Sequence, residues 1–205
     1  MKKRELKISH LYEMHEREID SFSQVLAEGF EGYSLFEYFC DNNYDLSKMK
    51  LFWKVALTAS HQKVYSISDS SKLNGVAVFF PPEYKDIGVL SYLFAGGYKL
   101  LGKLNVAKML KFDSFAAKIK RKYADRNTWY IYSVAVLKDA RGKGIGSKLL
   151  KTMLDHFDNE NQNCYLETLK AGNVAIYEHY GFKLMEQIKV PGTDMTLYAM
   201  LREAK

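Results

Sequence analysis

The sequence contains little cysteine, little proline and no clustered histidine. Its two cysteines, Cys40 and Cys164, stand in unrelated contexts and the five histidines are scattered, so there is no C-x-x-C motif and no zinc-binding spacing. These absences exclude a zinc finger and a disulfide framework. We therefore expect no metal site and a location in the reducing cytoplasm. With only 3 prolines and 13 glycines, a long flexible linker is excluded, and residues 1–205 are expected to form a single domain.

The sequence also lacks a long hydrophobic run. Residues 87–104 form the longest weakly polar stretch, but Lys99 and Lys103 interrupt it. It contains too few apolar residues to span a bilayer, so no integral membrane association is expected. A helix that lies at the membrane interface stays a possible alternative for this stretch. The N-terminus has no apolar core after its charges, unlike a secretory signal.

The chain carries a modest excess of positive charge. Its formal net charge of +6 suits a phosphorylated ligand, a nucleic acid or an anionic membrane, or simply a mildly basic surface. There is no basic helix and no aromatic-stacking motif, so no nucleic-acid partner is expected.

In the first half, the hydrophobic spacing predicts helices followed by two strands. The first forty residues are predicted to be helical, with one apolar face made of Tyr12, His15, Ile19, Phe22, Val25 and Leu26. Further helices are expected at 35–40 and 46–59, and strands at 63–68 and 74–80. Residues 83–127 again have a helical pattern. This long insertion between strands is either a substrate wall or lid, or extra packing.

The second half predicts alternating strands and helices. Residues 128–137 are aromatic and β-branched without a polar face, which is typical of a central strand covered on both sides. The remaining expected elements are a helix with an apolar face from Ile145 to Phe157, a strand at 163–169, a helix at 173–181, and strands at 182–190 and 194–201. Asn173 is the expected N-cap of the helix at 173–181, and Gly181 its expected end. This order indicates an α/β domain with a mixed sheet.

The segment "DARGKGIGSKLL", residues 139–150, is the strongest candidate for binding a phosphate. A P-loop and a dinucleotide-binding fingerprint both require glycine where Ser147 stands. The pattern R-x-x-G-x-G remains, formed by Arg141, Gly144 and Gly146. Glycines without Cβ atoms let backbone N–H groups converge on an anion, and the start of the following helix adds its own unpaired N–H groups. A pyrophosphate is the expected ligand.

Four motifs in sequence order carry a resemblance to a known family. They are "VAV" at 134–136, "RGKGIGSKLL" at 141–150, "YLET" at 165–168 and "NVAIYEHYGF" at 173–182. With these motifs, the sequence resembles the GNAT superfamily of acyl-CoA-dependent N-acetyltransferases, and looks most like its puromycin N-acetyltransferase-type branch. The resemblance covers residues 128–202, which would be the acyl-CoA-binding core. It implies a mixed, mostly antiparallel sheet flanked by helices.

The resemblance also implies which residues bind the cofactor acetyl-CoA. Its pantetheine arm would lie along the backbone of Val134, Ala135 and Val136, with Asn173 nearby. The pyrophosphate would be held by backbone N–H groups of Arg141, Gly142, Lys143, Gly144, Ile145, Gly146 and Ser147. Tyr177 shares a helix face with Asn173 and would protonate the thiolate of CoA.

Glu167 is the second expected catalytic residue, because it stands in an otherwise apolar strand. A buried carboxylate is costly unless it is paired or functional. Glu167 could act as general base towards the incoming amine, or it could orient the amine or hold a neighbouring strand. By contrast, Cys164 alternates away from Glu167 and is expected in the core, while His179 is expected at the surface.

Together these features predict an enzyme that moves an acetyl group from acetyl-CoA to a primary amine in a ternary complex. A small-molecule amine is the favoured substrate. The alternatives are acetylation of a protein amine, or a non-catalytic acyl-CoA sensor. A monomer and a homodimer are both compatible with the sequence.

Overall fold

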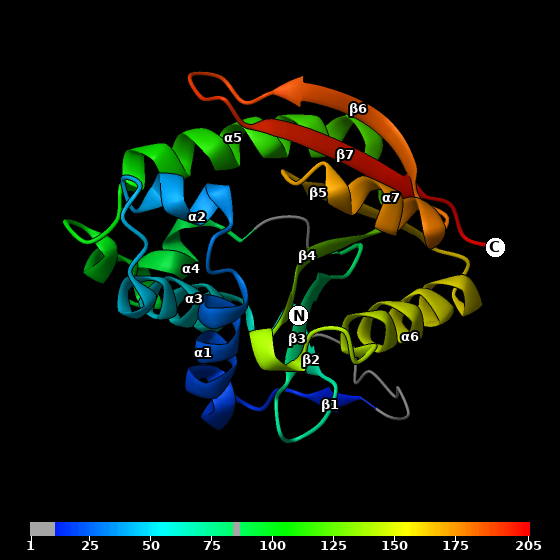
Figure 1. Cartoon of the computed structure of the whole chain (residues 1–205), viewed down its shortest axis with the longest axis horizontal. Coiled ribbons are helices and arrows are strands. Elements are labelled where there is room, and N and C mark those ends of the chain that lie inside the picture. The colour runs from blue at the N-terminus through cyan, green and yellow to red at the C-terminus, as the bar shows by residue number, and fades with distance from the viewer. Residues whose placement is uncertain (1–10, 84–86) are drawn as a thin grey trace.

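The computed structural model describes residues 11–83 and 87–205, and is built around one seven-stranded sheet in the order β1-β2-β3-β4-β5-β7-β6 (Figure 1). The strands are β1 (Tyr12–Glu13), β2 (Tyr65–Ser68), β3 (Gly75–Phe80), β4 (Thr128–Val136), β5 (Asn163–Thr168), β6 (Lys183–Lys189) and β7 (Thr196–Arg202). β4 and β5 are parallel, and every other neighbouring pair is antiparallel. The predicted mixed, mostly antiparallel sheet is confirmed.

Helices cover both faces of this sheet. The α-helices are α1 (Ile19–Gly29), α2 (Ser34–Phe39), α3 (Leu46–Ser60), α4 (Val89–Phe94), α5 (Val106–Tyr123), α6 (Ile145–Asn159) and α7 (Gly172–His179), and the 3-10 helices are η1 (Glu16–Glu18), η2 (Gly97–Leu100) and η3 (Lys138–Ala140). α1 and α3 lie on the opposite side of the central strands from α6 (Figure 1). Each side has its own apolar core, as expected when a sheet is buried between helices.

The N-terminal helix is shorter than its spacing predicts. Tyr12 pairs with Ser68 at the edge of the sheet, His15 precedes η1, and α1 begins only at Ile19. The prediction of helix at Tyr12 and His15 is therefore wrong. The spacing of apolar residues indicates which side chains are buried. It does not indicate whether the backbone can pair with the free edge of a sheet, as Tyr12 does here. The first ten residues of the predicted helical segment lie outside the described residues.

β4 is covered differently on its two faces. Trp129 and Ile131 are buried in the core on the α6 side, whereas Tyr130 and Tyr132 lie on the α1 side and are only half-buried. The predicted cover on both sides of the strand is present, but it is incomplete on the α1 side. The helices on that side stand away from the strand and leave a cavity, so the aromatic residues of β4 line a site as well as a core.

The close contact between α1 and β4 depends on a missing side chain at Gly29. A Cβ atom placed there would lie 2.7 Å from the Ala135 Cβ and 3.4 Å from the Ala135 Cα. We expect Gly29→Ala to lower the free energy of unfolding by about 1–3 kcal/mol, because the end of α1 must move away from the strand. Gly88→Ala is the matched control, since no atom lies within 4 Å of a Cβ there. Urea denaturation measures both, and equal stability of the two variants would contradict the prediction.

Candidate active site

The parallel strands β4 and β5 pair at one end and separate at the other. Their register runs from Thr128 opposite Asn163 to Ile131 opposite Leu166, and it ends there although β4 continues to Val136. On the other edge of β4, Ser133 pairs with Val78 and Ile131 pairs with Phe79, so Tyr132 is an extra residue in the β3–β4 ladder. A bulge of this kind bends its strand. The result is a wedge between β4 and β5.

The backbone of β4 presents hydrogen-bonding groups to this wedge. The Leu137 N–H donates to the Asn74 carbonyl at 2.9 Å, next to the pair formed by Gly75 and Val136. In an antiparallel ladder this pattern makes Gly75 and Val136 a non-hydrogen-bonded pair. The N–H and C=O groups of Val136, and those of Val134 two residues earlier, therefore point away from β3. They face the side on which β5 has separated.

The glycine loop leads directly into α6 at the mouth of the wedge. Gly142 and Gly144 have φ angles of +75° and +74°, and Gly144 is the N-cap of α6. No atom lies within 4 Å of a Cβ built at either glycine, so the space above the loop is open. The N–H of Lys148 donates to the Gly144 carbonyl at 2.9 Å. The N–H groups of Ile145, Gly146 and Ser147 precede this bond, and such groups at a helix start are available to an anion.

The basic side chains of the loop bond to carbonyls of the chain itself. Arg141 donates from Nε to the Val136 carbonyl at 3.2 Å and from Nη2 to the Gly29 carbonyl at 3.0 Å. Lys143 donates from Nζ to the Asp139 carbonyl at 2.8 Å. These bonds tie the loop to β4 and to the end of α1. They hold the shape of the loop. Since these side chains are already bonded to carbonyls, the backbone N–H groups are the donors that the loop can offer to an anion.

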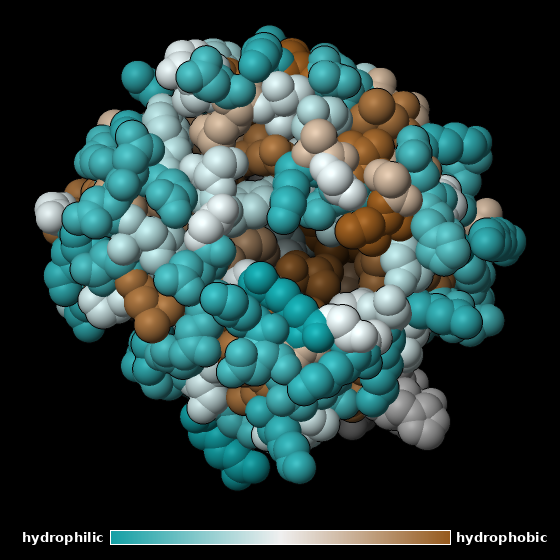
Figure 2. Space-filling view, in the orientation of Figure 1, coloured by the Kyte–Doolittle hydropathy of each residue, from teal (hydrophilic) through white to brown (hydrophobic). Residues whose placement is uncertain are grey.

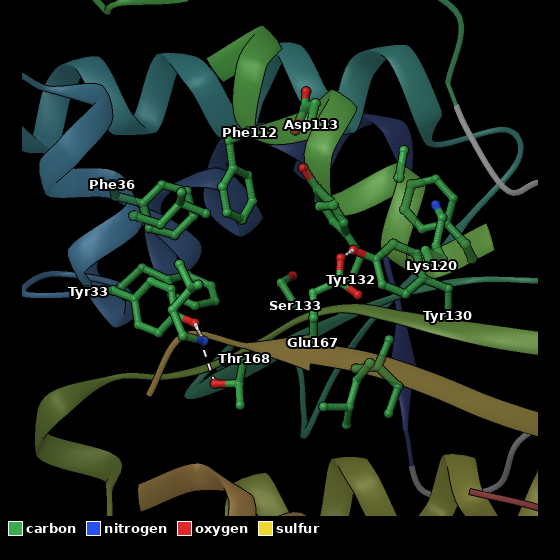
Figure 3. Close-up of a pocket in the computed structure, with 18 of the residues that line it drawn as sticks. Tyr33, Phe36, Phe112, Asp113, Lys120, Tyr130, Tyr132, Ser133, Glu167 and Thr168 are labelled. Carbon is green, nitrogen blue, oxygen red and sulfur yellow. Dashed lines mark hydrogen bonds between the residues drawn. The ribbon is translucent and has the colours of Figure 1, made fainter. Parts of the chain in front are cut away.

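Asn173 lies inside α7 and does not cap it. The helix begins at Gly172 with Ala171 in the N-cap position, so the prediction of Asn173 as N-cap is wrong. Its Nδ2 instead donates to the Thr168 Oγ1 at 3.1 Å, which draws the side chain towards the end of β5. The Thr168 hydroxyl also lies 3.5 Å from the hydroxyl of Tyr33 (Figure 3). The expected end of α7 is confirmed, because Gly181 has a φ of +89°.

Tyr177 lines the same cavity as Asn173, one helical turn further along α7. Its ring packs against that of Phe182, with a centroid distance of 5.8 Å. Burial raises the pKa of Tyr177 to about 12, and the neighbouring Tyr33 acts in the same direction. The phenol is therefore protonated throughout the neutral range and can act as a proton donor.

Glu167 lies across the wedge from β4 and is bonded to one of its tyrosines. The Tyr130 hydroxyl donates to Oε1 at 2.8 Å, whereas the buried Oε2 has no hydrogen-bond partner among the described residues (Figure 3). Burial raises the pKa of Glu167 to about 7, while the bond from Tyr130 and the ammonium of Lys120 act in the opposite direction. Near neutral pH this carboxyl is thus poised between its charged and neutral forms, as a general base requires.

Val134, Glu167, Asn173 and Tyr177 line one cavity of about 510 Å³. Figure 2 shows the hollow near the centre of this face, with hydrophobic residues inside it. The insertion at 83–127 forms part of its wall through Val89, Tyr92, Leu110, Phe112 and Lys120. Its role as a substrate wall stays a prediction. Ala116 and Ile119 of α5 are buried in the core, so the insertion also adds packing.

Sequence reasoning missed several residues of the cavity. Tyr33, Tyr130, Tyr132, Ser133 and Lys120 all line it. Ser133 has a buried hydroxyl with no partner among the described residues. The only sequence signal for Tyr130 and Tyr132 was their place in a strand without a polar face. Nothing in that pattern indicates that Tyr130 meets Glu167, which is 37 positions further along the chain.

Two expectations about individual residues are confirmed. Cys164 is fully buried, and burial raises the pKa of its thiol well above the ordinary range, so it belongs to the core. His179 is exposed.

Over residues 11–83 and 87–205, no group of three or more His, Cys, Asp or Glu side chains is placed to hold a metal ion. In the same part of the chain, no helix has both the length and the apolar character to cross a membrane.

A splayed strand pair beside an open helix start has the shape and the exposed N–H groups that an extended, phosphorylated ligand requires. Comparison with known proteins gives the family. The acetyltransferase (GNAT) family model matches residues 33–182. The chain therefore belongs to the acetyltransferase (GNAT) family, a family of acyl-CoA-dependent N-acyltransferases.

Similar proteins agree with this assignment. An uncharacterized N-acetyltransferase of Schizosaccharomyces pombe is 33% identical over 84 residues, which are 40% of this chain and 34% of that protein. The chain thus covers about a third of the length of this curated relative.

Solved structures share the fold at low identity. A histone acetyltransferase HPA2 and related acetyltransferase of Corynebacterium glutamicum has a TM-score of 0.63 at 17% identity, covering 95% of this chain and 96% of that chain. The YncA acetyltransferase of Salmonella typhimurium, solved with acetyl-CoA, has a TM-score of 0.53 at 12% identity, covering 95% and 93%.

Proposed function

We propose that this protein is an N-acetyltransferase that moves an acetyl group from acetyl-CoA to the primary amine of a small molecule. The observation that carries the proposal is Glu167, a carboxyl with a raised pKa that lines the cavity. It faces a cavity that also contains the open end of the β4–β5 wedge. The enclosing helical insertion and the resemblance to the puromycin N-acetyltransferase-type branch both favour a small acceptor over a protein surface.

The residues present fit acetyl-CoA. The wedge-facing backbone groups of Val134 and Val136 match an amide-bearing arm such as pantetheine. The open glycine loop and the start of α6, from Gly142 to Ser147, match a pyrophosphate. Asn173 stands beside the end of β5, within reach of the same arm. When bound there, acetyl-CoA would supply the activated acetyl group as a thioester.

Glu167 begins the reaction by removing a proton. An amine arrives as an ammonium ion, and the Glu167 carboxylate accepts one of its protons directly or through a water, which leaves a nucleophilic nitrogen. A C–N bond to the acetyl carbon would then form as the C–S bond breaks, and the nitrogen would release its second proton to solvent, which leaves the neutral amide. The backbone N–H of Val136 faces the wedge and stabilises the negative charge that develops on the carbonyl oxygen. Tyr177 gives its phenolic proton to the departing sulfur and regains one from solvent. The net products are the acetamide, the free thiol and one proton.

Binding of acetyl-CoA is the direct test, and the glycine loop provides a matched pair of variants. Gly144→Ala and Gly192→Ala both place a Cβ on a residue with φ near +75° in open space, so each is expected to cost about 1 kcal/mol of stability. Only Gly144→Ala alters the loop, and it is expected to weaken acetyl-CoA binding about tenfold in calorimetry. Gly192→Ala should bind as the wild type does. Absence of binding by the wild type at millimolar acetyl-CoA would overturn the proposed function.

A further inference from the structure

We infer that the acceptor is a primary amine with a single ammonium group on an aromatic body. This inference rests on the proposed function and names the substrate class of the same site. Three independent features of the cavity support it: the chemistry of its walls, the number and position of its charges, and two exposed apolar side chains at its entrance.

The walls of the cavity are mainly aromatic. The lining rings belong to Phe30, Tyr33, Phe36, Phe39, Phe52, Trp53, Phe80, Tyr92, Phe112, Tyr130, Tyr132 and Tyr177. They come from elements that are far apart in the chain, and they support one another. Phe30 stacks on Trp53 with centroids 5.5 Å apart, and Tyr132 meets Trp53 edge to face at 5.9 Å. The core rings among them form the outer layer of this aromatic box. Six half-buried rings can meet a ligand, those of Phe30, Tyr33, Tyr92, Tyr130, Tyr132 and Tyr177. Their exposed faces and edges match an aromatic ligand better than an aliphatic polar one.

The charges in the inner part of the cavity suit one ammonium group. Among the described residues that line it, the charged ones are Asp113, Lys120, Arg121 and Glu167. Asp113 and Arg121 are exposed and belong to the entrance, whereas Glu167 and the 6% exposed Lys120 belong to the inner part. The Lys120 ammonium sits over the Tyr130 ring, 4.4 Å from its centroid, and Tyr130 bonds to Glu167 (Figure 3). The single ammonium of the acceptor would be deprotonated at Glu167, whereas a second ammonium would meet the positive charge of Lys120 at close range.

The entrance of the cavity carries exposed apolar side chains beside the charged Asp113 and Arg121. Val89 and Leu110 line the cavity, and yet 67% and 57% of their surfaces are exposed. Both belong to the helical insertion at 83–127. Apolar side chains at the mouth of a pocket gain stability when a ligand covers them. An acceptor with an aromatic body would cover both, while a polyamine or a polar sugar would leave them in water.

The acceptor class can be tested by thiol release from acetyl-CoA. We expect kcat/KM for tryptamine and 2-phenylethylamine to exceed that for spermidine and for a lysine-containing peptide by about 100-fold, because only the aromatic amines fill the box and avoid Lys120. A higher kcat/KM for spermidine or for the peptide would overturn this inference and leave the proposed function intact. So would acetyl-CoA binding without turnover of either aromatic amine. Absence of acetyl-CoA binding would overturn the proposed function itself.

Variants at the entrance separate ligand contact from folding. Val89→Ser and Leu110→Ser are expected to raise KM for tryptamine about tenfold each, with kcat, acetyl-CoA affinity and Tm unchanged, because these side chains are already exposed in the free protein. Leu101→Ser is the matched control, since this leucine is 65% exposed on the same insertion but does not line the cavity. An unchanged KM in both entrance variants, or an equal rise in the control, would overturn the inference.

Discussion

Glu167→Gln is expected to lower kcat/KM by about 10²- to 10³-fold, because glutamine cannot accept the proton of the incoming ammonium. Acetyl-CoA affinity should change little, since the proposed cofactor contacts are on β4, the glycine loop and α7. The wild type should gain activity as pH rises through about 7, where Glu167 loses its proton. The variant should lose this dependence. Steady-state kinetics between pH 5.5 and 9 measure both effects.

The same substitution is expected to stabilise the fold. Burial raises the pKa of Glu167 from its ordinary value of 4.5 to about 7, so between these values the folded state holds its proton more tightly than the unfolded state does. The free energy of unfolding contributed by this group is fully present below the unfolded pKa and is lost as pH rises through the folded pKa. A glutamine side chain at this position would carry no charge at any pH. We therefore expect Glu167→Gln to raise the free energy of unfolding by about 3 kcal/mol at pH 8 and by little at pH 4.5.

Opposite changes in activity and stability distinguish a catalytic Glu167 from a structural one. If Glu167 merely held a neighbouring strand through its bond from Tyr130, the glutamine variant would keep its activity. Glu203→Gln is a suitable control, because Glu203 is an exposed partner of Lys183 on the surface. It should alter neither kcat/KM nor the pH profile. A Glu167→Gln variant with wild-type kcat/KM would contradict the general-base assignment.

Tyr177→Phe is expected to lower kcat by about 10²-fold and to leave acetyl-CoA binding unchanged, because the ring packing is kept and only the proton donor is lost. The pH dependence of kcat in the wild type gives a second test of Tyr177. Since the pKa of Tyr177 is raised to about 12, the wild-type kcat should not fall between pH 8 and pH 10 through loss of this proton.

The control for Tyr177→Phe is Tyr98→Phe, which removes a hydroxyl from a tyrosine that is 60% exposed and does not line the cavity. It should leave kcat unchanged. Full activity of the Tyr177 variant would remove this residue from the proton-donor role. A loss equal to that of Glu167→Gln, together with a lowered Tm, would instead indicate damage to the packing with Phe182.

Local patterns in the chain determined much of the fold and the position of the ligand loop. The apolar face of α6 and the strands β4 and β5 followed from spacing and side-chain type, because these signals act between near neighbours. Gly142, Gly144 and Gly181 occupy left-handed backbone, as turn chemistry requires. The failures at Tyr12 and at the Asn173 cap share one cause. Tyr12 pairs with β2 instead of joining a helix, and the Asn173 side chain bonds to Thr168 instead of capping α7. In both places the partner lies outside the predicted helix.

Only the tertiary structure decided how the site is assembled. The separation of β4 from β5 depends on where their pairing stops and on the extra residue Tyr132. The spacing of apolar residues along the sequence predicts neither of these features. The bond from Tyr130 to Glu167 joins neighbouring strands, and the bond from Arg141 to the end of α1 joins residues 112 positions apart. The sequence by itself determined most of the elements, the glycine loop and the candidate base Glu167, because each is encoded within a few residues. The candidate acid Tyr177 followed from the family resemblance. The raised pKa of Glu167 and the aromatic box arise only when distant segments pack together and exclude water.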